Sequence, residues 1–248
     1  MKDFLTLRTD EEASSVCRRL NDNKNIFPVD WPDFVNTPLE GERVSLATIN
    51  SNDAAADLFE AATFDDKEQE IWRFMGFGPF LDKNKMKDWL YKCEESRDPL
   101  FLGFSDKISG NLGGMGSFME IRPKVGVVEI GNIWLGGKWQ RDVKGTESLS
   151  LMMRHAMHTL GYRRLEWKCN ALNLASRSAA LRLGFRYEGT FLNHLIVKGK
   201  SRDTSWFSIT EQEWPRVYSA HLSWLDAVNF DELGVQKISL QSLTKAFW

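Results

Sequence analysis

The sequence predicts an α/β fold in which helices flank a β-sheet. From Leu39 onward, segments with the two-residue alternation of strands are interleaved with segments of helical periodicity. A strand-like run at 129–135 leads through a short glycine-containing turn into an amphipathic helix. A second helix is bounded by Asn173, a typical N-cap residue, and by Gly184, a typical residue after a helix C-terminus. At 248 residues, the chain is long enough to bury a substantial core.

Residues 1–38 are expected to form an appendage, namely a helix followed by an extended arm. A capping box at 9–12 precedes apolar residues at helical spacing. Prolines and aromatic residues then alternate in the arm: Phe27, Pro28, Trp31, Pro32, Phe34 and Pro38. We expect the arm to pack its aromatic side chains on the main domain, and a lid over the substrate is the alternative.

The main domain is expected to span residues 39–215 and to begin with a strand at 41–47. Helices follow at 53–62 and 83–95, the second with Met86, Trp89, Leu90 and Cys93 on one face. Strands at 100–105 and 111–121 then lead through a turn at 122–126 back to the strand at 129–135. Three glycines in the strand at 111–121 are not followed by a helix start, so we expect them to allow a close neighbouring backbone: Gly113, Gly114 and Gly116.

The helix after the turn has a clear apolar stripe, which predicts that its methionines are core residues. The stripe consists of Leu149, Met152, Met153, Ala156, Met157 and Leu160, and Gly161 ends the helix. His155 and His158 lie off this stripe and are expected on a solvated face. Strands at 189–197 and 204–210 follow, and Trp214-Pro215 opens a last helix. Residues 216–248 are expected to form the rest of that helix and a tail.

Composition excludes several classes of protein. Lys and Arg number 32 against 34 Asp and Glu, so no electrostatic footprint for nucleic acid is visible. The cysteines, at positions 17, 93 and 169, are too scattered for a disulfide framework or a zinc site. The first residues lack the apolar core of a signal peptide, and no apolar run is long enough for a membrane span. We therefore expect a cytoplasmic protein with no metal and no membrane partner.

The turn at 136–146 is the first candidate for chemistry. It contains several glycines and basic residues and lies between a strand and a helix. Such a turn presents backbone N–H groups and the positive end of a helix dipole to an anion. A pyrophosphate is the anion that we expect here, and an ordinary strand–helix turn is the alternative.

Together with the segment 166–185, this turn resembles the GNAT superfamily of acetyl-CoA-dependent N-acetyltransferases. The family's pyrophosphate motif, Gln/Arg-x-x-Gly-x-Gly/Ala, is matched by 140–145, except that Val143 replaces the first glycine. The family's Asn-x-x-Ser and Leu-Gly-Phe are matched by Asn173, Ser176 and the run 183–185. The closer likeness is to the Rim-type branch, which acetylates ribosomal-protein N-termini, and to related amine acetyltransferases. The resemblance covers residues 39–215 and implies a mixed, mostly antiparallel, splayed sheet.

The resemblance also implies where acetyl-CoA would bind. Its pantetheine would pair with the backbone of Ile133, Trp134 and Leu135, where the next strand splays away. The pyrophosphate would be held by the turn, through Gln140, Arg141, Val143, Lys144, Gly145 and Thr146, with Arg141 and Lys144 adding charge. Asn173 would contribute at the start of the second helix. Arg182 or Arg177 could meet further phosphate, and a solvated basic helix face is the alternative for each.

Acetyl transfer to an amine requires a base and, at the departing thiolate, a proton donor. Glu129 is the first candidate base, a salt-bridged strand-end carboxylate is the alternative, and Glu166 is the reserve. Many GNAT enzymes carry a tyrosine four residues before the glycine that ends the helix, but that position is Ala180 here. Ser176 is then the expected proton donor, and Asn173 either fixes the local geometry or is a plain helix cap.

We therefore expect an N-acetyltransferase whose acceptor is a primary amine, on a protein N-terminus or on a small molecule. The absence of a charge cluster suited to a peptide tail slightly favours a small amine, as in detoxification or self-protection. A CoA-binding interaction module without turnover is the second alternative, because Val143 and Ala180 depart from the family pattern. The protein would act as a monomer or a homodimer.

Overall fold

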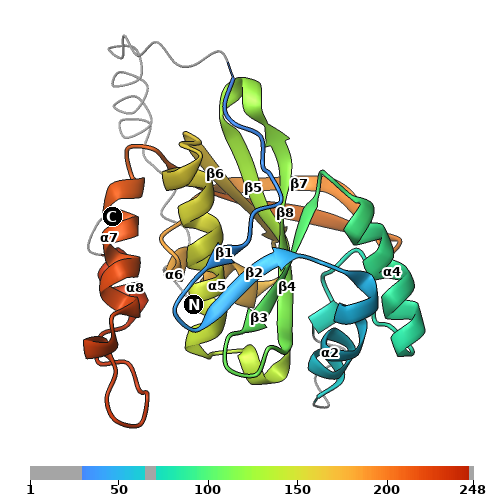
Figure 1. Cartoon of the computed structure of the whole chain (residues 1–248). Helices are drawn as coiled ribbons and strands as arrows, with labels where there is room; N and C mark the ends of the chain where they lie inside the picture. The colour runs from blue at the N-terminus through green and yellow to red at the C-terminus, as the bar shows by residue number, and fades with distance from the viewer. Residues whose placement is uncertain (1–29, 65–70, 246–248) are drawn as a thin grey trace.

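The computed structural model describes residues 30–64 and 71–245, which form an open sheet with helices on both faces (Figure 1). Within these residues the sheet has eight strands in the order β1-β2-β3-β4-β5-β6-β8-β7. Every neighbouring pair is antiparallel except β5 and β6, which run parallel. The predicted α/β fold with a mixed, mostly antiparallel sheet is therefore confirmed.

The bounds of the elements follow the hydrophobic patterns of the sequence closely. The strands are β1 (Leu39–Glu40), β2 (Val44–Thr48), β3 (Leu100–Asp106), β4 (Leu112–Arg122), β5 (Val127–Leu135), β6 (Arg164–Asn170), β7 (Arg186–Val197) and β8 (Lys200–Thr210). The helices are α2 (Ser51–Thr63), α4 (Lys83–Glu95), α5 (Val143–Arg154), α6 (Leu174–Arg182), α7 (Trp214–Leu225) and α8 (Leu240–Lys245). In Figure 1, α2 and α4 lie together on one side, and α7 and α8 lie beyond α5 and α6 on the other.

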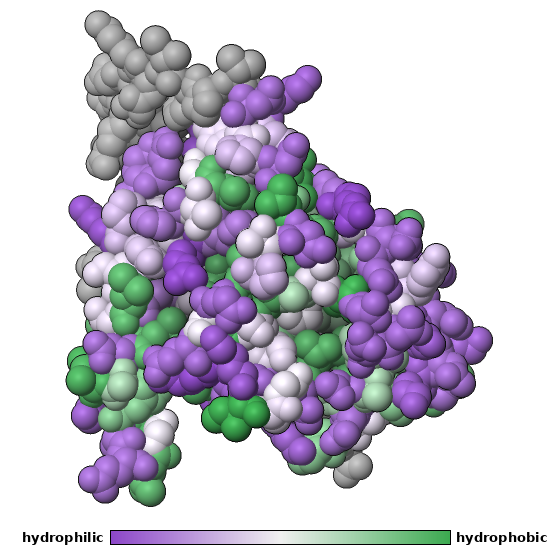
Figure 2. All heavy atoms as spheres, viewed as in Figure 1, coloured by the Kyte–Doolittle hydropathy of each residue, from purple (hydrophilic) through white to green (hydrophobic). Residues whose placement is uncertain are grey.

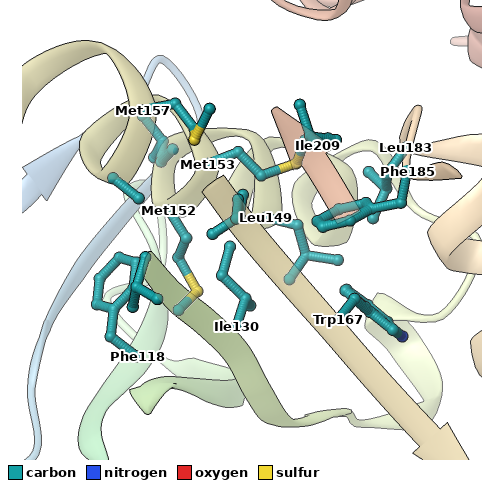
Figure 3. Packing of buried hydrophobic residues seen from close by; sticks show 14 of the residues in the cluster. Phe118, Ile130, Leu149, Met152, Met153, Met157, Trp167, Leu183, Phe185 and Ile209 are labelled. Atoms are coloured by element: carbon teal, nitrogen blue, oxygen red, sulfur yellow. The ribbon is translucent and has the colours of Figure 1, made fainter. Parts of the chain in front are cut away.

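The main core lies between α5 and the sheet (Figure 3). Met152 and Met153 point from α5 toward the sheet, where Phe118 and Ile130 lie close to Met152, and Met157 is buried in the same core from the turn that follows α5. The prediction that these methionines are core residues is confirmed. The surface seen in Figure 2 is mostly polar, with apolar groups scattered over it.

The expectation that both histidines of this helix face solvent is wrong for His155. The helix continues beyond Arg154 as a π-helical turn, His155–Thr159, before Gly161 at φ +67° ends it. His155 is half-buried because Phe34 of the N-terminal arm and Phe118 of β4 pack on it, with ring centroids 5.7 and 5.9 Å away. His158 is exposed, as expected.

The described part of the N-terminal arm packs on the main domain, as expected. Trp31 is buried, and its indole N–H donates to the carbonyl of Gly161 at 2.7 Å. Phe34 lies against Tyr162, with ring centroids 5.2 Å apart. The expected helix after the capping box at 9–12, together with Phe27 and Pro28, lies outside the described residues.

The C-terminal segment forms more structure than a tail. Helix α7 begins at Trp214 with Pro215 in its first turn, as predicted. After it, Asn229 anchors the chain, donating to the carbonyls of Trp224 and Ile238. The short helix α8 then packs on α7 and α6. Across residues 30–64 and 71–245, no helix is both long and apolar enough to cross a bilayer.

Candidate active-site cleft

A cleft opens where β5 and β6 diverge. The two strands pair only from Val127 to Glu129, opposite Arg164 to Glu166. Beyond Glu129, the edge of β5 that faces β6 has no strand partner among the described residues. The predicted splay is therefore present, and it leaves backbone N–H and C=O groups of β5 facing the cleft.

A bulge in β5 produces the divergence. Asn132 has φ +52°, in the left-handed region, and the β4–β5 register shifts beside it. The Asn132 amide donates to the hydroxyl of Ser117 at 3.0 Å, and that hydroxyl donates to the carbonyl of Gly131 at 3.2 Å. These side-chain bonds hold the bulge and turn β5 away from β6.

The cleft is large, with a volume of about 1980 Å³. One wall contains the free edge of β5, the turn at 140–146 and the first turns of α6. A second wall contains the segment 71–76 and the strands β7 and β8, and C-terminal residues between Trp224 and Gln241 complete the lining. A donor and an acceptor could therefore enter from different sides and meet at the end of the β5–β6 pairing.

The turn at 136–146 packs closely, which explains Gly145. A Cβ atom at this position would lie 2.8 Å from Cδ1 of Leu135 and 3.0 Å from the carbonyl oxygen of Trp139. Trp139 in turn occupies the space beside Gly113 of β4, as expected for a strand glycine that allows close approach. Arg141 lies exposed in the left-handed region at φ +62° and lines the cleft.

Lys144 differs from the expectation that it adds charge to the anion site. Its ammonium pairs with Asp106 of β3 at 2.9 Å, and Lys144 is absent from the described residues that line the cleft. Its backbone N–H donates to the carboxylate of Asp142, the N-cap of α5, at 2.8 Å. Arg141 is therefore the cation of the turn that faces the cleft.

Asn173 caps α6, as the sequence predicts. Its side-chain oxygen accepts the backbone N–H of Ser176 at 3.1 Å. The Ser176 hydroxyl accepts the indole N–H of Trp167 at 3.0 Å, and it also forms a hydrogen bond with the buried Cys169 side chain. Asn173 and Ser176 both line the cleft.

Arg182 joins the two segments that the sequence analysis singled out. From the last turn of α6, its guanidinium donates to the hydroxyl of Thr146 on α5 at 2.7 Å. Burial lowers the pKa of Arg182. Arg177, the alternative, instead donates to the carbonyl of Ala171 at 3.1 Å and does not line the described cleft. Arg182 is thus the better placed of the two.

Glu129 lies at the end of the β5–β6 pairing and lines the cleft. It is 5% exposed, and Lys168 of β6 places its ammonium 2.8 Å from a carboxylate oxygen of Glu129. Burial raises the pKa of Glu129, and the charge and hydrogen bond of Lys168 oppose that rise without cancelling it. Glu129 is therefore both salt-bridged and open to the cleft.

Glu166 is held differently from Glu129. Three cations contact it: Arg122 at 2.6 Å, Arg164 at 2.8 Å and Lys168 at 3.1 Å. Burial would raise the pKa of Glu166, but the hydrogen bonds and charges of these cations outweigh it and lower the pKa. Glu166 is absent from the described lining of the cleft. Of the two candidate bases, Glu129 has the access and the higher proton affinity.

The hairpin of β7 and β8 closes the second wall. At its tip, the ammonium of Lys198 donates to the carbonyls of Trp72, Phe77 and Gly78 at 3.0, 3.2 and 2.7 Å. These bonds fasten the segment 71–78 to the sheet. His194 and Trp206 line this wall, with ring centroids 5.9 Å apart.

Most residues predicted for the donor side line one cleft. They are Ile133, Trp134, Leu135, Gln140, Arg141, Val143, Gly145, Thr146, Asn173 and Arg182. Lys168, Arg202 and Thr204 also line the cleft and were not among the predicted site residues. Each lies on the cleft face of its strand, two residues from a neighbour on the same face. The two-residue alternation can be read from the sequence. Which face of each strand lines the cleft depends on the order of the strands in the sheet, which the sequence does not give.

Three comparisons place these features among known proteins. The family described as "Acetyltransferase (GNAT) domain" matches residues 43–186. A GCN5-related N-acetyltransferase from Brucella melitensis is 38% identical, with 88% of this chain and 98% of that chain covered and a TM-score of 0.85. A probable GNAT-family acetyltransferase from Chromobacterium violaceum is 30% identical, with 78% and 100% covered and a TM-score of 0.69.

A third structure shares the fold at 21% identity. It is the microcin C7 self-immunity acetyltransferase in complex with acetyl-CoA and AMP, with 68% of this chain and 93% of that chain covered and a TM-score of 0.60. The search of curated proteins found no match.

Proposed function

The chain belongs to the GNAT family of acetyltransferases, and from that premise we propose that it transfers an acetyl group from acetyl-CoA to a primary amine by direct attack in a ternary complex. The observation that carries the proposal is the cleft at the β5–β6 divergence. There the free edge of β5, the turn at 140–146, Glu129 and Ser176 all line a single space.

The donor side fits acetyl-CoA. The unpaired edge of β5 from Ile133 to Leu135 offers N–H and C=O groups to the amides of pantetheine. The N-terminus of α5 and the exposed guanidinium of Arg141 suit a pyrophosphate, and Arg182 adds a second cation beside Thr146. The carboxylate of Asp142 already satisfies one N–H at this terminus, so Gly145, Thr146 and Arg141 carry more of the proposed contact.

Bound acetyl-CoA supplies a thioester carbonyl that an amine can attack. Before the attack, Glu129 takes a proton from the ammonium, directly or through a water molecule, because only the neutral amine is a nucleophile. Its access to the cleft and its raised pKa favour this role over Glu166. The pKa of an α-amine is about 8, so a modest base suffices at neutral pH.

Ser176 gives its proton to the departing sulfur. Its hydroxyl accepts from Trp167 and is held near the N-terminus of α6, whose dipole also favours a developing negative charge. The methyl side chain of Ala180 has no proton to donate, so no side chain at that position competes for the task.

The acceptor is either a small amine or a protein N-terminus. A Rim-type assignment draws support from a fold neighbour from Vibrio cholerae, described as a candidate ribosomal-protein-serine acetyltransferase, at 20% identity. The small-amine alternative draws support from the segment 71–76, which lines the cleft and is held to the β7–β8 hairpin by the hydrogen bonds of Lys198 to the neighbouring carbonyls. We propose a cytoplasmic enzyme, monomeric or dimeric.

A panel of amines incubated with labelled acetyl-CoA tests the proposal. The panel holds small amines, amino acids, and peptides with free N-termini. Stoichiometric CoA release and acetylated product are expected for at least one class, and the Glu129→Gln variant is the matched control. Tight CoA binding without turnover of any amine would instead identify a non-catalytic CoA-binding module.

A further inference from the structure

The acceptor wall of the cleft carries a row of polar atoms that the proposed reaction leaves unused. Arg202, Thr204 and Trp206 alternate along β8, so their side chains lie on one face of the sheet. All three line the cleft. Nε of Arg202, Oγ1 of Thr204 and Nε1 of Trp206 are buried, and none has a hydrogen-bond partner among the described residues.

Such a row is unusual, because buried polar side chains are almost always hydrogen bonded. The packing around Trp206 fixes its indole. The Lys168 ammonium lies 4.3 Å from the centre of its ring, and Phe191 packs on it with centroids 4.8 Å apart. Each of the three groups can donate a hydrogen bond. Positions 202 and 206 lie about 13 Å apart along the strand, so one ligand group cannot reach the whole row, and Arg202 is the charged member of the row.

The positive charge of Arg202 indicates that the ligand group it binds is an anion. Within the described residues, no carboxylate lies within salt-bridge distance of Arg202. Lys168, in contrast, is already paired with Glu129 and Glu166. Burial lowers the pKa of Arg202, while the charge of Glu129 acts in the opposite direction. A planar guanidinium donates two parallel hydrogen bonds to a carboxylate, which favours that anion.

The cleft thus has a negative and a positive end on its acceptor side. Glu129 and Glu120 line it near the β5 bulge, and Arg202 lines it on β8. We propose that the acceptor is a primary amine that also bears a carboxylate, with the amine at Glu129 and the carboxylate on the guanidinium of Arg202. The inference rests on the proposed acetyl transfer. A free amino acid and a peptide that begins with an acidic residue both supply this chemistry.

Pairs of amines that differ only in the carboxylate test the inference. The full-length protein receives acetyl-CoA with leucine or isoamylamine, phenylalanine or phenethylamine, and lysine or cadaverine. We expect kcat/KM to favour the amino acid of at least one pair by about 10²-fold or more. A peptide acceptor is tested with two amidated tetrapeptides, one beginning with Asp and one with Asn. Only the peptide that begins with Asp carries a carboxylate.

Arg202→Gln removes the charge and is expected to raise KM for the preferred amino acid by about 10–10²-fold. Its KM for acetyl-CoA should not change. Lys200→Gln is the matched control, because it removes the same charge from β8 at an exposed position absent from the described cleft lining. Arg202→Lys should restore part of the preference. Melting temperatures establish that each variant is folded.

Two results would overturn the inference while leaving acetyl transfer intact. One is equal or better turnover of the decarboxylated amines, and the other is an unchanged preference in Arg202→Gln. If no amine is acetylated, calorimetric titration of the CoA-bound protein with the amino acids decides. Binding that Arg202→Gln weakens would support the carboxylate site and reject acetyl transfer, whereas the absence of binding would overturn the site as well.

Discussion

Lys168 of β6 places its ammonium 2.8 Å from the carboxylate of Glu129 on β5. Glu129 is the last paired residue of β5, and Lys168 lies two positions beyond Glu166, the last paired residue of β6, so the ion pair joins the strands where the backbone ladder ends. The ion pair also affects the pKa of Glu129, the candidate base. Burial raises this pKa, and Lys168 opposes the rise because it favours the ionised carboxylate.

Glu129→Gln should leave CoA binding intact and lower kcat by roughly 10²-fold or more, because the amide cannot take the proton of the amine. The loss should shrink at high pH, where the free amine is already populated. Profiles of kcat against pH for both proteins measure this. An equal loss at every pH would indicate a structural role, and wild-type activity would exclude Glu129 as the base.

Lys168→Met should shift the acid limb of the kcat–pH profile to higher pH, because this variant lacks the cation that lowers the pKa of Glu129. Activity at pH 6 should fall, and activity at high pH should largely recover. Lys107→Met is a control, since it breaks an exposed ion pair with Glu40 away from the cleft. An acid limb that stays in place in Lys168→Met would argue that Glu129 is not the titrating group.

Free CoA should raise the melting temperature, since at 100 times its dissociation constant a ligand stabilises the folded state by roughly 2.7 kcal/mol. Gly145→Glu should abolish the shift, because its side chain would collide with Leu135 and place a negative charge beside the phosphates. Arg141→Gln, at an exposed position, should reduce the shift without misfolding.

Lys138→Gln serves as the control for that series. It lowers the net charge by one on an exposed residue of the same loop that is absent from the described cleft lining. Its shift should match that of the native protein. No shift with millimolar CoA in the native protein would contradict the proposed donor site.

Ser176→Ala should lower kcat by roughly 10–10²-fold, since a thiolate is already a fair leaving group and needs only modest assistance. It also removes the acceptor of the Trp167 indole N–H, which should cost about 1–3 kcal/mol of stability. Trp167→Phe removes the same hydrogen bond but keeps the hydroxyl. A kcat that falls equally in both variants would show that the bond, and not the proton, matters.

Stability should decrease below neutral pH because of His221. Its ring is buried, with Nδ1 2.5 Å from the hydroxyl of Ser150 and Nε2 2.9 Å from the carbonyl of Leu183. Burial lowers the pKa of His221 to about 4. An unfolded histidine titrates near 6.5, so the unfolded chain binds the proton more tightly, and about 3 kcal/mol is lost between pH 7 and pH 4.

Urea denaturation at several pH values measures this loss. Other groups also titrate over the range, so the comparison is with His221→Gln, which keeps a polar side chain but cannot bind the proton. The pH dependence should be flatter in that variant. Equal slopes in the two proteins would contradict the assignment to His221.

The sequence was sufficient for the elements that depend on local signals. The cap at Asn173, the stop at Gly161 and the helix Lys83–Glu95 are all present, because capping and apolar periodicity are properties of consecutive residues. The donor side was also predictable, because most of its residues come from the continuous stretch 131–182.

Other features depend on residues that are distant in the sequence. Lys144 was predicted to bind the anion, but its ammonium pairs with Asp106 of β3. His155 was predicted to be exposed, but Phe34 packs on it. The row of Arg202, Thr204 and Trp206 could be identified only from the structure, because it depends on the position of β8 between β6 and β7. No local pattern encodes such neighbours, since the sheet order determines them.

The three bonds donated by Lys198 fasten residues that lie more than a hundred positions apart along the chain. On a ribosome, which releases the N-terminal part first, the donor-binding stretch emerges before the hairpin that carries this lysine. The segment 71–78 therefore lacks these three hydrogen bonds until the hairpin has been synthesised. The acceptor wall is accordingly completed after the donor-binding stretch in a nascent chain, and the lining residues between Trp224 and Gln241 follow it.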